Sequence, residues 1–132
     1  MRKVMCFGTF DILHLGHLNY FKQAKKLGDY LIVVVARDKN TEKAGKIVLF
    51  SEQERLEMVK NILLVDEAVL GNKEDSFRVI LEKKPAMICL GYDHQISEEE
   101  LKEKLAQRGF YPEIRRMTAY QVDKYKSSKI RK

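Results

Sequence analysis

Two histidines, His14 and His17, stand around Gly16 directly after a short apolar run that ends in glycine and threonine. The run 4–7 reads as a strand, and the residues from 15 onward have the spacing of an amphipathic helix. A strand that passes through a glycine turn into a helix N-terminus binds phosphate well, because bare backbone N–H groups and the helix dipole both favour an anion. Two imidazoles on one helical turn can donate to the same anion. The pattern therefore indicates chemistry on a nucleoside triphosphate.

The two histidines allow two other interpretations. They could ligate a metal from one helical face, although no cysteine or carboxylate cluster with ligand spacing accompanies them. They could also do no more than cap the turn, although histidines paired around a glycine are an unusual cap. We favour phosphate binding and expect no protein-held metal site.

The stretch 7–17 resembles the Thr-Phe-Asp-x-x-His-x-Gly-His motif of the nucleotidyltransferase superfamily that includes the small cytidylyltransferases. Six of its residues stand in register with that motif, namely Gly8, Thr9, Asp11, His14, Gly16 and His17. The resemblance implies that the two histidines contact the triphosphate near the scissile bond, with backbone and hydroxyl donors of the turn beside it. The nucleotide-binding residues expected here are Thr9, Phe10, His14, Leu15, Gly16 and His17.

Three charged side chains could assist the same chemistry. Asp11 could act as a base, but we expect it to brace the loop. Lys43 and Lys46 lie in a Lys-rich segment where they could reach phosphates, or they could form an ordinary solvated charge run. We expect His14, His17 and Lys46 to be catalytic. The acceptor phosphate is already anionic, so the enzyme must mainly align substrates and absorb charge, a task that a divalent ion such as Mg²⁺ usually shares.

Later parts of the chain supply further nucleotide-binding candidates. Ser127 and Ser128 are similar to the Ser/Thr-Ser/Thr-x-Ile element of the superfamily, whose hydroxyls hold the β- and γ-phosphates. Asp93 follows a strand end and could accept from ribose hydroxyls or a base amine. Tyr120 offers an aromatic face to a purine. Residues 117–120 replace the Arg-Thr-Glu-Gly-type segment of the cytidylyltransferases, so we expect ATP in preference to CTP.

Several short stretches narrow the resemblance. Residues 35–38, 54–59, 90–93 and 100–114 look like the archaeal-type FAD synthases. That likeness implies an adenylyltransferase that joins FMN to the AMP part of ATP and releases pyrophosphate, with ATP and FMN as partners and a homodimeric state. The alternatives are a glycerol-3-phosphate or sugar-phosphate cytidylyltransferase and, from another class, a nucleotide-binding or RNA-binding module without catalysis. The intact histidine pair argues against a mere binding module.

These residues must be positioned by a sheet with helices on both faces. Strand-like segments at 4–7, 30–36, 67–70, 87–90 and 113–117, most of them short apolar runs, alternate with helical patterns at 15–27, 51–62, 75–83 and 97–109. We expect a polar loop over 37–46 and a final helix opening at 127. Continuous apolar strands separated by helices are typical of a parallel sheet covered on both faces. The predicted fold is α/β, a Rossmann-like, doubly wound, five-stranded parallel sheet of the nucleotidyltransferase type, with the ligand at the carboxyl ends of the strands.

Composition is consistent with one domain spanning residues 1–132. The net charge of +6 suits anionic partners, but the basic residues form no single block, which disfavours nucleic acid. No apolar run approaches the ~20 residues of a membrane helix, and we expect a cytoplasmic protein without membrane contact. We expect the first and fourth strands to pair, which would make Cys6 and Cys89 neighbouring buried free thiols.

Overall fold

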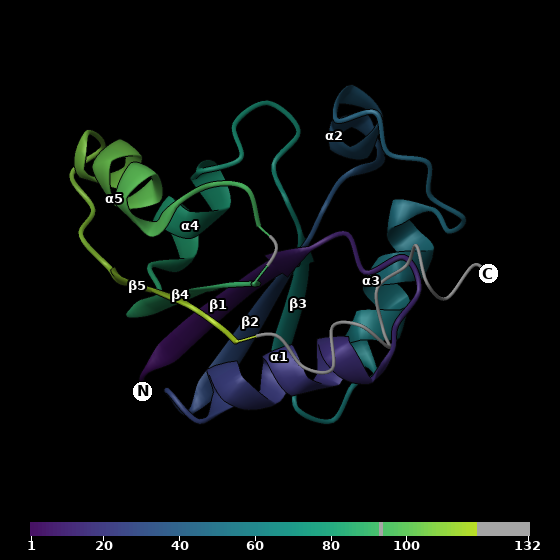
Figure 1. The fold of residues 1–132 in the computed structure, drawn as a ribbon, viewed down its shortest axis with the longest axis horizontal. Coiled ribbons are helices and arrows are strands. Elements are labelled where there is room, and N and C mark those ends of the chain that lie inside the picture. Colours follow the sequence, from purple (N-terminus) through teal and green to yellow (C-terminus); the bar gives the residue numbers. More distant parts are fainter. Residues whose placement is uncertain (93, 119–132) are drawn as a thin grey trace.

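The computed structural model describes residues 1–92 and 94–118, and its centre is a parallel sheet of five strands (Figure 1). The strands are β1 (Lys3–Gly8), β2 (Tyr30–Val35), β3 (Glu67–Leu70), β4 (Met87–Leu90) and β5 (Glu113–Arg116). Their order is β3-β2-β1-β4-β5, and every neighbouring pair is parallel. The predicted sheet is confirmed, and the connections reverse direction at the boundary between β1 and β4. In open α/β sheets such a switch point is where ligands bind.

Alternate residues of each central strand are buried against opposite layers of helices. Val4 and Cys6 of β1 pack into one core, while Met5 between them packs into the other. The first core also holds residues of α1 (Leu15–Lys25) and α3 (Glu52–Lys60), and the second holds residues of α4 (Arg78–Lys83) and α5 (Glu98–Ala106). The helices therefore cover both faces of the sheet, as the continuous apolar strands predict (Figure 1).

The expected loop over 37–46 is wrong, because residues Asp38–Lys43 form the short helix α2. Its sequence carries no apolar stripe, so periodicity could not reveal it. Tertiary contacts stabilise it instead: Thr41 is buried, and the backbone N–H of Asp38 donates to Glu52 Oε1 over 2.8 Å. Helix α4 also begins at Arg78, later than the predicted residue 75.

The predicted pairing of the first and fourth strands is confirmed by the two cysteines. Cys6 and Cys89 are register partners on β1 and β4, and both are buried free thiols. Burial raises the pKa of the Cys6 thiol. Within the described residues, no helix is long and apolar enough to cross a membrane.

Candidate active site

The turn between β1 and α1 is fixed by a buried aromatic ring. Phe10 adopts a left-handed backbone with φ of 56°, and its side chain is only 3% exposed. The ring lies against Gly8, where an added Cβ would stand 2.6 Å from Phe10 Cζ. Phe10 therefore anchors the turn from within the core, and only its backbone remains available for the ligand contact predicted for it.

His14 and His17 cap the first turn of α1 reciprocally. His14 is the N-cap residue, and its Nδ1 accepts from the backbone N–H of Gly16 over 3.0 Å. In return, His17 Nδ1 accepts from the backbone N–H of His14 over 3.2 Å. The arrangement follows the logic of a capping box, with imidazole nitrogens in place of the usual hydroxyl and carboxylate oxygens.

These two bonds assign the neutral tautomer of both rings. A neutral imidazole that accepts at Nδ1 carries its proton on Nε2. Both histidines therefore offer an Nε2–H donor, and the two ring centroids lie 4.2 Å apart. Burial lowers the pKa of His14 below its ordinary value of 6.5, which favours this neutral form. Capping and phosphate binding are thus compatible, because capping uses Nδ1 of each ring and phosphate binding would use Nε2.

Gly16 and Leu15 lie at the first turn of α1. The backbone N–H of Gly16 is used in the cap on His14. Leu15, the first residue of α1, is 50% exposed and borders an apolar hollow of about 340 Å³. That hollow is lined by Leu13, His14, Leu15, Leu18 and Ile62.

Asp11 braces the loop that precedes α3. Its Oδ2 accepts from the backbone N–H of Leu49 over 2.8 Å, and its Oδ1 accepts from that of Phe50 over 2.9 Å. Both carboxylate oxygens are thus engaged in holding one segment to the β1–α1 turn. This geometry supports the bracing role expected for Asp11 over a role as a base.

Lys46 reaches the β1–α1 turn from the far end of α2. Its Nζ lies 3.5 Å from Thr9 Oγ1, so an ammonium group and a hydroxyl meet beside β1. Lys43 ends α2 and is exposed. The structure therefore brings Lys46, Thr9 and the two histidines to the same edge of the sheet.

Arg55 is a site-building residue that the sequence analysis missed. Its side chain is fully buried and donates to carbonyl oxygens of three segments: Thr9 (2.9 Å), Ala36 (2.8 Å) and Phe50 (3.1 Å). Its Nη2 also donates to Asp38 Oδ1 over 2.7 Å. Arg55 thereby ties the ends of β1 and β2 to the loop before α3. The one available signal was its spacing of four residues from Val59, which is also buried on α3.

Asp38 and Glu52 complete this charged network. Each carboxylate accepts from the other residue's backbone N–H, and Arg37 donates to Glu52 over 3.0 Å. The pKa of Asp38 is lowered by the backbone N–H of Glu52 and by Arg55. The pKa of Glu52 is lowered first by the backbone N–H of Asp38. Both carboxylates are therefore held in the ionised form.

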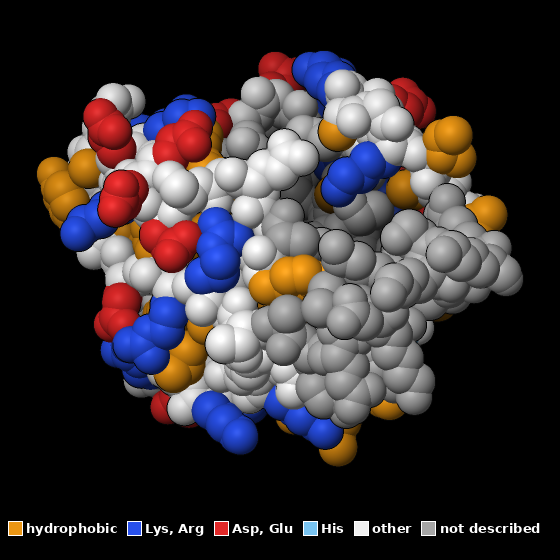
Figure 2. Space-filling model, in the orientation of Figure 1, with side chains coloured by type: hydrophobic (Ala, Val, Ile, Leu, Met, Phe, Trp, Pro, Cys, Tyr) orange, Lys and Arg blue, Asp and Glu red, His pale blue; other side chains and the backbone are white. Residues whose placement is uncertain are grey.

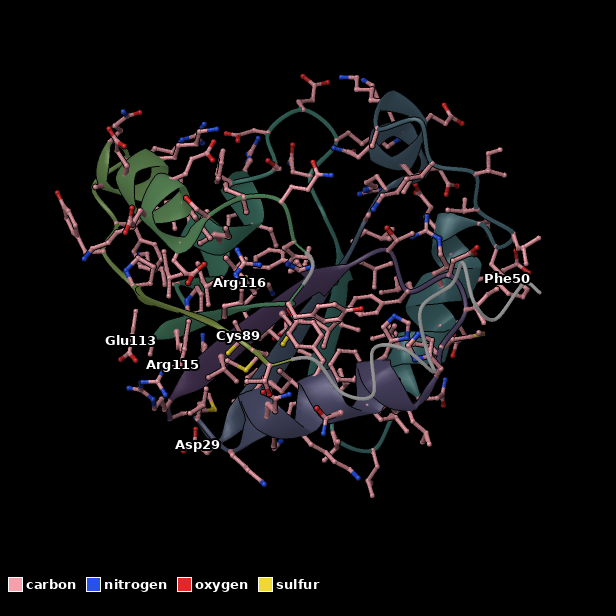
Figure 3. The ribbon with its side chains drawn as sticks, in the orientation of Figure 1. Asp29, Phe50, Cys89, Glu113, Arg115 and Arg116 are labelled. Atoms are coloured by element: carbon pink, nitrogen blue, oxygen red, sulfur yellow. The ribbon has the colours of Figure 1, made fainter. Side chains whose placement is uncertain are left out.

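On the other side of the switch point, Arg116 organises the segment after β4. Its Nη1 donates to the carbonyls of Gly91 and His94 over 2.8 and 2.9 Å, and its Nε donates to Glu98 over 2.9 Å. Phe50 lies on the α3 flank of the molecule, while Arg116 and Cys89 lie near β4 (Figure 3). The other predicted nucleotide-binding residues lie outside the described part of the chain, namely Asp93, Tyr120, Ser127 and Ser128.

Between β1 and β4 the hydroxyl of Tyr20 bridges the two strands. It accepts from the backbone N–H of Phe7 and donates to the carbonyl of Cys89. The register pairing of β1 with β4 ends at Cys6 and Cys89. Beyond that pair, the Tyr20 hydroxyl connects the backbones of the two strands. The two strands thus diverge at the predicted ligand edge.

The described residues do not fit a metal site built by the protein alone. Over 1–92 and 94–118, no three His, Cys, Asp or Glu side chains are grouped so that they could hold an ion. Asp11, the carboxylate nearest the turn in sequence, is already engaged with two backbone N–H groups.

Comparison with known proteins places this geometry in a family. Residues 5–132 match the family described as cytidylyltransferase-like. The chain therefore belongs to the cytidylyltransferase-like family of nucleotidyltransferases. Within it, the chain is 45% identical over 132 residues to a protein named FAD synthase from Thermoplasma volcanium, which covers 100% of this chain and 93% of that protein.

Two further matches agree with this placement. A FAD synthase from Ferroglobus placidus is 48% identical over 119 residues, which cover 90% of this chain and 78% of that protein. A crystal structure titled as a lipopolysaccharide core biosynthesis protein from Thermoplasma volcanium GSS1 has a TM-score of 0.90 and 45% identity, covering 92% of this chain and 99% of that one. The fold is thus shared with an experimentally determined relative.

Proposed function

We propose that this chain transfers the AMP part of ATP to FMN, giving FAD and pyrophosphate. The observation that carries the proposal is the 45% identity over the whole chain to proteins named FAD synthase. The reciprocal histidine cap supports the reaction type, because it puts two imidazole donors at a helix N-terminus on the ligand edge of the sheet.

The described residues suit a transfer that depends on alignment and charge stabilisation. The FMN phosphate attacks the α-phosphorus of ATP, a new P–O bond forms, and the bond to the leaving pyrophosphate breaks. The Nε2–H groups of His14 and His17 donate to the phosphate oxygens on which charge develops. Lys46 adds a cation beside Thr9 at the same edge. No strong base is needed, because the attacking phosphate is already ionised.

We further propose that a divalent ion accompanies the triphosphate. Mg²⁺ usually keeps several waters and binds through substrate phosphates with few protein ligands. That habit is compatible with the lack of a three-residue ligand group in the described residues. The homodimeric state, the lack of nucleic-acid and membrane partners and the cytoplasmic location also stay predictions.

Product analysis tests the function directly. The purified protein is incubated with Mg²⁺, with ATP or CTP, and with FMN, glycerol 3-phosphate or a sugar phosphate, and products are separated by chromatography. We expect FAD and pyrophosphate from ATP with FMN. Transfer of CMP to a polyol or sugar phosphate, with ATP inert, would instead establish the cytidylyltransferase alternative.

A further inference from the structure

A second hollow, separate from the apolar hollow beside His14, opens between α2 and the segment that leads into α3. Its volume is about 300 Å³, at the lower end of the range for small-molecule sites. The apolar part of its wall is the run Val48, Leu49 and Phe50, and Leu49 is 70% exposed. Hydrophobic side chains gather on this flank of the molecule below the position of α2 (Figure 2). The full lining is Asp38, Thr41, Glu42, Lys46, Val48, Leu49, Phe50 and Ser51.

The apolar wall is held in place by the site itself. Asp11 accepts the backbone N–H groups of Leu49 and Phe50, and buried Arg55 donates to the Phe50 carbonyl. An exposed leucine on a backbone fixed at three points is a preformed surface, and preformed surfaces lose little conformational freedom on binding. The hollow therefore has the construction of a binding site.

A cation stands at the edge of the hollow nearest the reactive turn. Lys46 lines the hollow, and its Nζ lies 3.5 Å from Thr9 Oγ1 at the end of β1. An occupant with an apolar body against residues 48–50 would therefore present an anionic tail toward Thr9 and the histidines. Glu42 of α2 also lines the hollow, and its carboxylate can accept a hydrogen bond from an N–H of that body.

We propose that this hollow holds the isoalloxazine ring of the acceptor flavin, with the FMN phosphate directed by Lys46 toward the α-phosphorus. This inference rests on the proposed function and adds the place and orientation of its acceptor. The flavin is a flat, largely apolar ring with one ring N–H and a phosphate tail, which matches the wall, Glu42 and Lys46 in turn. In this arrangement the nucleotide binds on the β4 side of the switch point.

Flavin fluorescence tests the site without any turnover. FMN is titrated into the wild-type protein and into Leu49→Ser in the absence of ATP. We expect about tenfold weaker FMN binding in the variant, the equivalent of losing about 1.4 kcal/mol of apolar contact. Leu63→Ser is the matched control. Leu63 is 98% exposed and lies in the connection from α3 to β3, at the amino ends of the strands and away from the hollow. FMN binding should be unchanged in this variant. ATP affinity should be the same in all three proteins.

The absence of tryptophan from the chain allows a second measurement. Leu49→Trp and Leu63→Trp each introduce one emitter. FMN should quench the tryptophan at 49 strongly through ring contact and the tryptophan at 63 much less. Lys46→Ala should weaken FMN binding while leaving riboflavin, which lacks the phosphate, bound as tightly as before.

The outcomes separate the two proposals. If the wild-type protein makes FAD but the Leu49 and Leu63 variants bind FMN alike, the flavin site is wrong and the proposed function stands. If the wild-type protein makes no FAD from FMN and ATP, the proposed function itself fails. If Leu49→Ser changes the mass measured by light scattering and leaves FMN affinity intact, the apolar wall is a contact between copies of this chain and the inference is overturned.

Discussion

At the scale of single residues, the two nitrogens of each histidine ring, Nδ1 and Nε2, have different roles. Nδ1 of each ring accepts a backbone N–H and holds the helix end, while Nε2 carries the donor proton. The sequence predicted the two residues and their ligand edge from their spacing. From the sequence alone, capping and phosphate binding were alternative roles for the two histidines. Residue spacing does not show which imidazole nitrogen, Nδ1 or Nε2, faces the backbone.

This division predicts that the cap and the chemistry of His14 can be separated. Asparagine places an oxygen near the position of Nδ1 and is a favoured N-cap residue, but it has no group at the position of Nε2. We expect His14→Asn to lose roughly 10²–10³ in kcat, the scale of one lost transition-state donor, with little change in Tm. His14→Ala should lose similar activity and also about 1 kcal/mol of stability.

Steady-state rates and thermal unfolding of both variants measure the two effects. Turnover near the wild-type rate in His14→Asn would remove His14 from the chemistry and leave it only the cap. Equal Tm values for the asparagine and alanine variants would show that the side chain of residue 14 does not stabilise the helix end as a cap.

The lowered pKa of His14 predicts a pH effect of known sign. Burial keeps its folded pKa below the ordinary 6.5, so near that pH the unfolded chain binds more protons than the folded chain. The contribution to stability is therefore complete above 6.5 and is lost as the pH falls from 6.5 toward the folded pKa. NMR titration should show an imidazole pKa below 6.5 that disappears in His14→Asn. Titration of His14 at or above 6.5 in the unliganded protein would contradict this.

At the scale of elements, the β1–α1 turn depends on Gly8. A larger residue at this position would force neighbouring atoms to move. A Cβ on Gly8 would stand 2.6 Å from the buried Phe10 ring, which is itself held at a positive φ. We expect Gly8→Ala to shift that ring and its turn, lowering kcat by tenfold or more and stability by about 1–3 kcal/mol. Gly45→Ser is a useful comparison, because its Cβ meets nothing within 4 Å, although its φ of 73° adds some strain. Wild-type activity in Gly8→Ala would show that the turn can absorb the change.

Helix α3 contributes the buried guanidinium that joins three loops. Replacing Arg55 with methionine leaves the carbonyls of Thr9, Ala36 and Phe50 without their donor. Since breaking a buried charged network costs about 3–5 kcal/mol, we expect a loss of at least 3 kcal/mol in urea unfolding. Arg55→Lys should recover only part of it, because an ammonium cannot match the planar fork. A loss below 1 kcal/mol in Arg55→Met would contradict the network's role.

The elements differ in how far the sequence could predict them. Strands β1, β2 and β4 were predictable because their side chains are mostly buried on both faces of the sheet, which requires a continuous apolar run in the sequence. The cap of α3 was predictable because Ser51 and Glu54 bond reciprocally and locally. Helix α2 and the burial of Arg55 were not predicted, because the partners of both are distant in sequence. For Arg55 the local signal was only its four-residue spacing from Val59, which does not reveal those partners.

At the scale of the whole molecule, the two core layers share the four strands β1 to β4. Val4 and Cys6 face one layer while Met5 faces the other, so neither layer can lose its packing without exposing the strands that support the other. The active-site edge lies at the ends of these strands. Its geometry therefore depends on the whole sheet, although the candidate site residues lie in short loops and in the first turn of α1.

This shared sheet predicts a single cooperative unfolding transition for residues 1–132. Leu105 of α5 is fully buried in the layer away from α1, so Leu105→Ala should cost about 2–5 kcal/mol. Below the variant's melting range, kcat should stay within about twofold of wild type, because the cavity lies on the opposite face from the histidines. Far-ultraviolet and tyrosine near-ultraviolet circular dichroism should give coincident urea transitions in both proteins. Two separated transitions, with the α5 layer lost first and the α1 layer intact, would mean that the chain contains more than one folding unit.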